Sequence, residues 1–197
     1  ILFFMMGLPV LLGAQVFQTC PHQPYGDVVY ENPLNEKWLS AYDVKSYRLR
    51  LEVSNKSTEI DGMAWIKVEA TRAMDTIVFE LQDALDVFEI FLRADSYQTG
   101  SEIGLSFLHE KQAIFIRLDR EYAEGERFSI GIRYGGEAGQ NRGFFAGISH
   151  AKDPTYGFDV TYTLSEPHNA RDWFPVKQVL EDQIDSVRFE LQCDKQL

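Results

Sequence analysis

Alternation of apolar and polar residues with a period of two constrains the fold of this chain more than any other feature of its sequence. Between residues 47 and 53, apolar side chains occupy every second position and charged side chains lie between them, which is typical of a strand with one buried face. Strand-like segments follow at residues 64–68, 77–81, 87–92, 105–108, 114–118 and 128–134. Turn signals such as Asn55-Lys56-Ser57, Thr99-Gly100 and Glu124-Gly125 separate several of them. This spacing predicts an all-β fold of antiparallel sheets.

Glycines gather between Gly135 and Gly147. They do not form the phosphate-cradling G-x-G-x-x-G pattern between a strand and a helix, so the sequence does not support nucleotide binding. We expect this segment to be a mobile loop.

The composition suits a soluble, extracytoplasmic domain. Of the 197 residues, 45% are hydrophobic, which is enough to form the core of one domain. The 30 acidic and 19 basic residues give a formal net charge of −11. This charge argues against binding to nucleic acid or to an anionic membrane surface, because both need basic patches.

The first residues form an apolar run that ends in Gly13-Ala14, a pair that resembles a small-residue cleavage site. We interpret residues 1–14 as a signal peptide with an incomplete N-terminus, residues 15–39 as a leader or linker, and residues 40–197 as one β domain. The alternative is that this run forms a buried first strand. The run is too short to span a bilayer. The protein is therefore expected to be secreted or periplasmic. Whether Cys20 and Cys193 form a disulfide stays open.

The sequence contains no complete set of catalytic or metal-binding residues. Its four histidines lack metal-ligand spacing, and His109-Glu110 does not continue as H-E-x-x-H because Ala113 stands at the last position. We expect His109 and Glu110 to form an exposed turn pair. No catalytic residue, metal ligand or cofactor is therefore expected in this chain.

The stretch "TLSEPHNARDWFP", from Thr163 to Pro175, differs from the strands around it. Its two prolines and its charged residues are unsuited to a buried strand, because proline removes a ladder donor and charges are costly to desolvate. The stretch is predicted to form a site or a corner.

This stretch resembles a signature near the end of the N-terminal β domain of the aminopeptidase N family of zinc exopeptidases. The matching positions are Thr163, Glu166, Ala170, Arg171, Phe174 and Pro175. The resemblance extends over roughly residues 40 to 193 and implies saddle-like antiparallel sheets or a β-sandwich, incomplete at the C-terminus. The sequence departs from the family at Val176, Gln178 and Leu180, where the family often has Cys, Asp and Pro.

The resemblance implies that Glu166 holds the free α-ammonium of a peptide substrate. A carboxylate and an ammonium form a charge-assisted hydrogen bond worth about 1.5–3 kcal/mol. Pro167 would restrict the backbone after Glu166, and Arg171 would pair with a carboxylate to hold the corner. The aromatic rings of Trp173 and Phe174 would pack the corner against the sheet.

The resemblance also implies a zinc-dependent aminopeptidase as the full-length protein, with the zinc held by a catalytic domain that this chain lacks. The chain would then pack on that domain and position the substrate N-terminus. Two alternatives stay open: a non-enzymatic extracellular β-sandwich for binding or adhesion, and an inactive relative of the family. The reading frame beyond Leu197 would separate them.

Overall fold

The computed structural model describes residues 37–94, 102–139, 147–163, 169–179 and 182–193. The chain divides into two units, residues 1–31 and 32–197, and all the described residues belong to the second. The predicted signal peptide and most of the predicted leader therefore lie outside the described residues, as does the Thr99-Gly100 turn.

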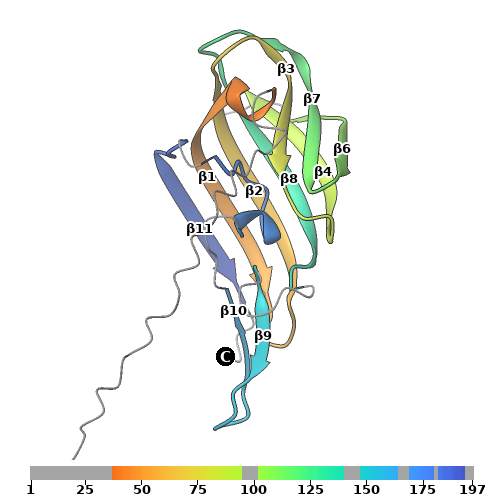
Figure 1. The fold of residues 1–197 in the computed structure, drawn as a ribbon, viewed down its shortest axis with the longest axis vertical. Helices are drawn as coiled ribbons and strands as arrows, with labels where there is room; N and C mark the ends of the chain where they lie inside the picture. The colour runs from red at the N-terminus through yellow and green to blue at the C-terminus, as the bar shows by residue number, and fades with distance from the viewer. Residues whose placement is uncertain (1–36, 95–101, 140–146, 164–168, 180–181, 194–197) are drawn as a thin grey trace, which may run out of the picture. The chain divides into compact units, whose positions relative to one another are not determined.

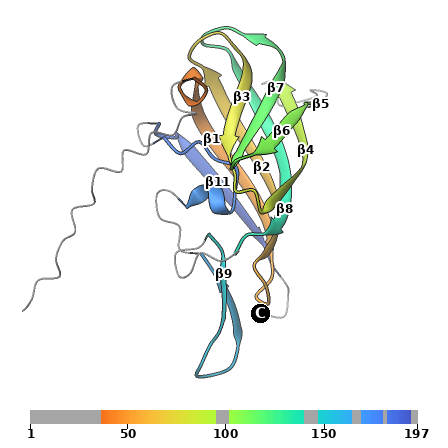
Figure 2. The ribbon, with the colours of Figure 1, turned by 45° about the vertical axis from the view of Figure 1, so that its right-hand side comes forward.

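The largest element is a six-stranded sheet with the strand order β11-β1-β2-β8-β4-β5 (Figure 1; β5 is labelled in Figure 2). Its neighbouring strands pair antiparallel, except that β11 runs parallel to β1. The strands are β1 (Tyr42–Val53), β2 (Glu59–Ala70), β4 (Leu85–Ala94), β5 (Ile103–Gly104), β8 (Arg127–Glu137) and β11 (Ser186–Gln192).

A three-stranded antiparallel sheet with the order β3-β7-β6 overlies one face of the large sheet (Figure 2). It consists of β3 (Met74–Glu80), β6 (Phe107–Glu110) and β7 (Ala113–Tyr122). A separate two-stranded ribbon is formed by β9 (Ser149–Lys152) and β10 (Asp159–Tyr162). Two short 3-10 turns, η1 (Leu39–Ala41) and η3 (Ala170–Asp172), complete the described elements. None of the helices in this part of the chain has the length and hydropathy to cross a membrane.

The hydrophobic core lies between the two larger sheets because the alternating residues of each turn their apolar side chains inward. In β2, Ile66 and Val68 are fully buried, and in β3 so are Ile77 and Phe79. The ring of Tyr42 in β1 meets that of Phe79 edge-on, with the centroids 5.6 Å apart. Each such side chain stabilises the fold by about 1.5–3 kcal/mol when fully buried. The prediction of an all-β fold of antiparallel, sandwich-like sheets is confirmed.

The outer face of the six-stranded sheet carries an aromatic cluster. The ring of Trp65 in β2 meets that of Phe91 in β4, with the centroids 4.7 Å apart, and the guanidinium of Arg93 lies 4.4 Å from the Trp65 ring centroid. Gly131 of β8 lies directly beneath both rings. A Cβ atom at this position would lie 2.3 Å from Phe91 and 2.8 Å from Trp65, so the rings occupy the space that a side chain would need.

Two local expectations from the sequence are wrong. His109 is not in an exposed turn but lies in β6, where its side chain is 12% exposed and its Nε2 is 3.1 Å from the carbonyl oxygen of Leu81. Gly135 and Gly136 belong to β8 and not to a loop. Gly135 allows a close approach of the backbone, because a Cβ atom there would lie 2.7 Å from the Ile60 carbonyl oxygen, and Gly136 has a φ of +133°, which side chains rarely allow.

Candidate functional site

The structure describes both ends of the Thr163–Pro175 stretch but not its middle. Thr163 follows β10, and Ala170 begins η3. Glu166 and Pro167 lie outside the described residues, so the role of Glu166 stays a prediction. The structure describes the residues on either side of this segment, Thr163 and Asn169 to Pro175, and how they are held against the sheets.

Arg171 pairs with a buried carboxylate, as predicted. Its Nη1 lies 3.2 Å from Oε1 of Glu80, at the end of β3, and the Glu80 side chain is only 3% exposed. The other carboxylate oxygen of Glu80 accepts a 3.1 Å hydrogen bond from the backbone N–H of Gln178. Removing one partner of a buried ion pair typically costs about 3–5 kcal/mol. Glu80 therefore ties the stretch to β3.

The backbone around this ion pair is also bonded to β3. Val176 and Glu80 exchange two backbone hydrogen bonds, of 2.8 and 3.0 Å, and the N–H of Gln82 donates to the Arg171 carbonyl oxygen at 2.9 Å. The side chain of Gln178 accepts a 2.9 Å hydrogen bond from the Arg171 N–H. Gln178 stands where the resembling family has Asp, and its amide oxygen still provides an acceptor for the corner.

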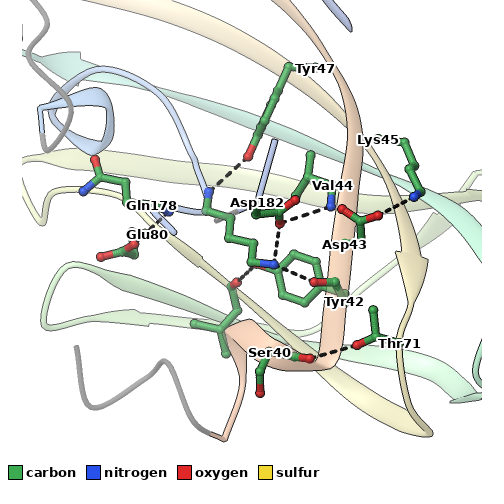
Figure 3. A network of polar contacts seen from close by, with 12 residues as sticks. Ser40, Tyr42, Asp43, Val44, Lys45, Tyr47, Thr71, Glu80, Gln178 and Asp182 are labelled. Carbon is green, nitrogen blue, oxygen red and sulfur yellow. Dashed lines mark hydrogen bonds and ion pairs between the residues drawn. The ribbon is translucent and has the colours of Figure 1, made fainter. Parts of the chain in front are cut away.

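A second polar network holds the same segment against β1 (Figure 3). Lys177 forms a nearly buried ion pair with Asp182, with side-chain exposures of 6% and 8%. Its Nζ donates a 2.6 Å hydrogen bond to the Tyr42 carbonyl oxygen, and its backbone N–H donates to the Tyr47 hydroxyl at 3.0 Å. The segment from Val176 to Gln178 thus lies between β1 and β3, with polar anchors on both sides.

Burial shifts the pKa values of the groups around Lys177. Burial, and then the hydrogen bond with Asp43, raises the pKa of Asp182 above its ordinary value. Burial also raises the pKa of Tyr42 and of Tyr47 well above the usual tyrosine range. Both phenols therefore stay protonated at neutral pH. The Tyr42 hydroxyl donates to the Val78 carbonyl oxygen at 2.5 Å, which joins β1 to β3.

The two ends of the stretch meet at Gly147. The Thr163 hydroxyl donates a hydrogen bond to the Gly147 carbonyl oxygen. Asp172, which is 3% exposed, packs directly on Gly147, where a Cβ atom would lie 2.7 Å from the Asp172 Cβ. The Gln82 side-chain amide donates to the carbonyl oxygens of Asp172 and of Ala138, the latter at 3.2 Å. Thr163 and Asp172, which lie on either side of Glu166 in the sequence, are thus both joined to Gly147. We call Thr163, Gly147 and Asp172 the frame.

The aromatic residues of the stretch pack against the sheet, as predicted. Trp173 and Phe174 are half-buried against the core, and their ring centroids lie 4.6 Å apart. Phe174 meets Tyr47 at 5.9 Å, and Trp173 meets Phe189 of β11 at 6.0 Å. Pro175 is buried. These contacts identify a packed corner and not a ligand platform.

Sequence reasoning missed the residues that receive the stretch: Glu80, Gln82, Gly147, Lys177 and Asp182. A signal existed for Glu80 and Gln82, because both polar side chains occur at the apolar end of a predicted strand. In the parts of the chain that the structure describes, no three His, Cys, Asp or Glu side chains are grouped so that they could hold a metal ion.

The fold is shared with solved zinc metallopeptidases. The M1 zinc metallopeptidase from Deinococcus radiodurans aligns with a TM-score of 0.60 at 20% sequence identity, over 79% of this chain and 33% of that chain. A mutant M1 zinc metallopeptidase from the same organism, bound to a Tyr-Ser-Ala substrate, aligns with a TM-score of 0.60 at 21% sequence identity, over 78% of this chain and 33% of that chain. A mutant two-domain M1 zinc metallopeptidase bound to L-arginine aligns with a TM-score of 0.60 at 20% sequence identity, over 79% of this chain and 33% of that chain. The chain therefore spans about a third of the length of these proteins.

The sequence identifies the family directly. Residues 43–177 match the sequence profile of the Peptidase M1 N-terminal domain. The chain belongs to this family, and its resemblance to the N-terminal β domain of aminopeptidase N-like zinc metallopeptidases is confirmed. The matched region ends at Lys177, directly after the corner. No curated protein sequence matches the chain.

Proposed function

We propose that this chain is the N-terminal domain of a secreted or periplasmic zinc-dependent aminopeptidase, in which Glu166 holds the α-ammonium of the peptide substrate. Family membership supports the peptidase class. The observation that carries the site assignment is the buried ion pair between Arg171 and Glu80. It makes the corner next to Glu166 a fixed structural feature, whereas a solvated loop would have no need of a buried charge pair.

The proposed contribution of Glu166 to catalysis is orientation. A carboxylate that holds the α-ammonium selects free chain ends, because an internal peptide bond has no such cation. Holding the ammonium also fixes the position of the first peptide bond. The ligands of two solved relatives, a Tyr-Ser-Ala substrate and L-arginine, both carry a free α-amine. This chemistry fits the proposed anchor.

The zinc implied by the family does not fit the residues described here. These residues contain no group of His, Cys, Asp or Glu side chains that could hold a metal ion. We therefore assign the metal to the catalytic domain of the full-length protein, which would also be the packing partner of this domain.

The test uses the full-length protein with Glu166→Ala. The variant should lower kcat/KM toward aminoacyl substrates about ten-fold or more, the loss expected for one charge-assisted hydrogen bond. Glu121→Ala, an exposed carboxylate in β7, is the control and should not change kcat/KM. An unchanged kcat/KM in Glu166→Ala rejects the anchor, and a full-length protein that does not cleave peptides rejects the peptidase.

Secretion has its own test. If residues 1–14 are a signal peptide, N-terminal sequencing of the mature protein from its native host should begin near residue 15. A mature protein that retains residues 1–14 would contradict secretion by this route and would favour the alternative of a buried first strand.

A non-enzymatic binding module is the second candidate, and one observation favours it. The tip of the β9–β10 ribbon exposes Tyr156 and Phe158 to 76% and 69%, and their rings stack 6.3 Å apart. Exposed aromatic pairs are common in binding surfaces. An H-E-x-x-H motif in the reading frame beyond Leu197 would decide for the peptidase, another β repeat for the binding module, and degenerate zinc ligands for an inactive relative.

A further inference from the structure

Gln82 is a buried polar residue that the family signature does not include. It is 6% exposed, and it follows β3 at the point where the Thr163–Pro175 stretch meets the sheet. A buried amide is costly unless it is hydrogen-bonded. The backbone N–H of Gln82 donates to the Arg171 carbonyl oxygen at 2.9 Å, and its Nε2 donates to the carbonyl oxygens of Asp172 and Ala138. Gln82 thus donates hydrogen bonds to two successive carbonyl oxygens of the stretch and to that of Ala138, the residue directly after β8.

The contacts of Gln82 continue to the other end of the stretch. Asp172 packs on Gly147, and the Gly147 carbonyl oxygen accepts the hydroxyl of Thr163. Thr163 and Asp172 lie on either side of Glu166 in the sequence, and both are joined to the frame that Gln82 holds. Gly147 is the contact point between them because an added Cβ would lie 2.7 Å from the Asp172 Cβ and 3.0 Å from its carbonyl carbon.

We propose that Gln82 is a positioning residue for the substrate α-amine and that it acts through the frame formed by Asp172, Gly147 and Thr163. This inference rests on the proposed function, and it adds a residue to the amine site that does not touch the substrate. A group that orients a substrate must be held to within about 1 Å, because a displacement of that size can cost about 100-fold in rate. Replacing Gln82 by methionine keeps a side chain of similar length at this buried position, so the substitution should displace the frame more than it unfolds the domain.

The test measures how strongly the full-length enzyme recognises the α-amine. The probes are leucine hydroxamate and the analogue in which hydrogen replaces the amine, since both share the metal-binding hydroxamate group. Wild-type protein should bind the amine-bearing probe about ten-fold or more tightly than its analogue, the ratio that one charge-assisted hydrogen bond provides. In Gln82→Met, which keeps the length of the side chain but lacks the donor, this ratio should fall about five-fold or more.

Gly147→Ala is a second variant that reaches the same frame from the other side. Its added methyl group should push Asp172 away and lower the ratio in the same direction, which keeps the inference testable if Gln82→Met does not fold. Val68→Ala is the matched control because Val68 is fully buried in β2 and outside the frame. It should destabilise the domain and leave the ratio of the two affinities within about two-fold, since a general loss of stability affects both probes equally.

The outcomes separate this inference from the proposed function. If the wild-type protein discriminates, Glu166→Ala abolishes the discrimination, and Gln82→Met and Gly147→Ala keep it, the inference is overturned and the proposed function stands. If the wild-type protein does not discriminate between the probes, or Glu166→Ala leaves the ratio unchanged, the proposed amine site itself is rejected. The inference is supported if the ratio of the two affinities falls in both Gln82→Met and Gly147→Ala and does not change in Val68→Ala.

Discussion

At the scale of single residues, Gly131 is the position where an added methyl group meets the most crowding on the outer face. Its missing side chain leaves room for the edge-to-face pair of Trp65 and Phe91, whose ring atoms would lie 2.3–2.8 Å from a Cβ atom. We expect Gly131→Ala to lower the free energy of unfolding by about 1–3 kcal/mol, the usual range for an overpacked site. Urea unfolding of the variant and the wild type measures this difference.

Gly104 provides a matched control for Gly131. It also lies in a strand of the six-stranded sheet, but a Cβ atom there would have no neighbour within 4 Å. Gly104→Ala should change the free energy of unfolding by no more than about 0.5 kcal/mol. Equal effects of the two substitutions would show that the aromatic rings move aside freely.

Single residues also show what the sequence can and cannot predict about the site. The pairing of Arg171 with a carboxylate and the packing of Trp173 and Phe174 follow from residue type, because a charge at a corner needs a partner and a large ring needs a surface. The partner itself, Glu80, could not be predicted, since most glutamates are solvated. The same reason hides the ion pair of Lys177 and Asp182. His109 was misjudged because an isolated His in a polar context is usually exposed.

At the scale of elements, alternation predicted every strand of the two larger sheets except β5, which is only two residues long, and β11. The segment Ser186–Gln192 does alternate, with Val187, Phe189 and Leu191 on one face, so this signal was present and was missed. The strands β9 and β10 are four residues long, and their sequences, SHAK and DVTY, contain too few apolar side chains for a period to be recognised. Two bulges have no local signal in the sequence because they depend on pairing with other strands. They lie in β1 between Val44 and Ser46 and in β4 between Val87 and Glu89.

The connection from β7 to β8 contains an acid-sensitive contact. Glu126 accepts hydrogen bonds from both terminal nitrogens of Arg120, at 2.8 and 3.0 Å, and from the N–H of Ala123. The Arg120 hydrogen bonds, and then the Ala123 N–H, lower the pKa of Glu126 from 4.5 to about 2. The pKa is lower in the folded state than in the unfolded chain. The stabilisation is therefore present above pH 4.5 and is lost as the pH falls toward about 2.

Glu126→Gln tests this contact. The variant should melt at a lower temperature than the wild type near neutral pH, and the difference in Tm should shrink to nothing as the pH approaches about 2. Glu124→Gln, an exposed neighbour in the same turn, should follow the wild-type profile. A Tm difference that is constant with pH would contradict the assigned contact.

At the scale of the whole described domain, the two larger sheets share one core. Residues of β1, β2, β4 and β8 form a single buried cluster with residues of β3 and β7. Neither sheet can lose its partner without exposing its own apolar face, so we expect both to unfold in one cooperative transition. Sequence patterns predicted this architecture because each strand buries one face. The order of the strands came only from the structure, since distant pairings are not encoded locally.

Tryptophan fluorescence can follow the two sheets separately. Trp65 lies in the six-stranded sheet, and Trp38 meets Phe115 of β7, with the ring centroids 6.3 Å apart. In variants that keep either Trp38 or Trp65 as the single tryptophan, with Trp173 replaced in both, the two probes and the far-ultraviolet circular dichroism should give the same urea midpoint. Separate midpoints would mean that the two sheets are independent folding units.

The parallel pairing of β11 with β1 has a consequence for the nascent polypeptide. Arg48 and Glu190 form an ion pair across these strands although they lie 142 positions apart in the chain. At about 5–20 residues per second, a ribosome needs on the order of ten seconds to synthesise the residues between them. During that interval the open side of β1 has no hydrogen-bonding partner from β11. We therefore expect translation to leave a bare strand edge that chaperones must shield from other emerging chains.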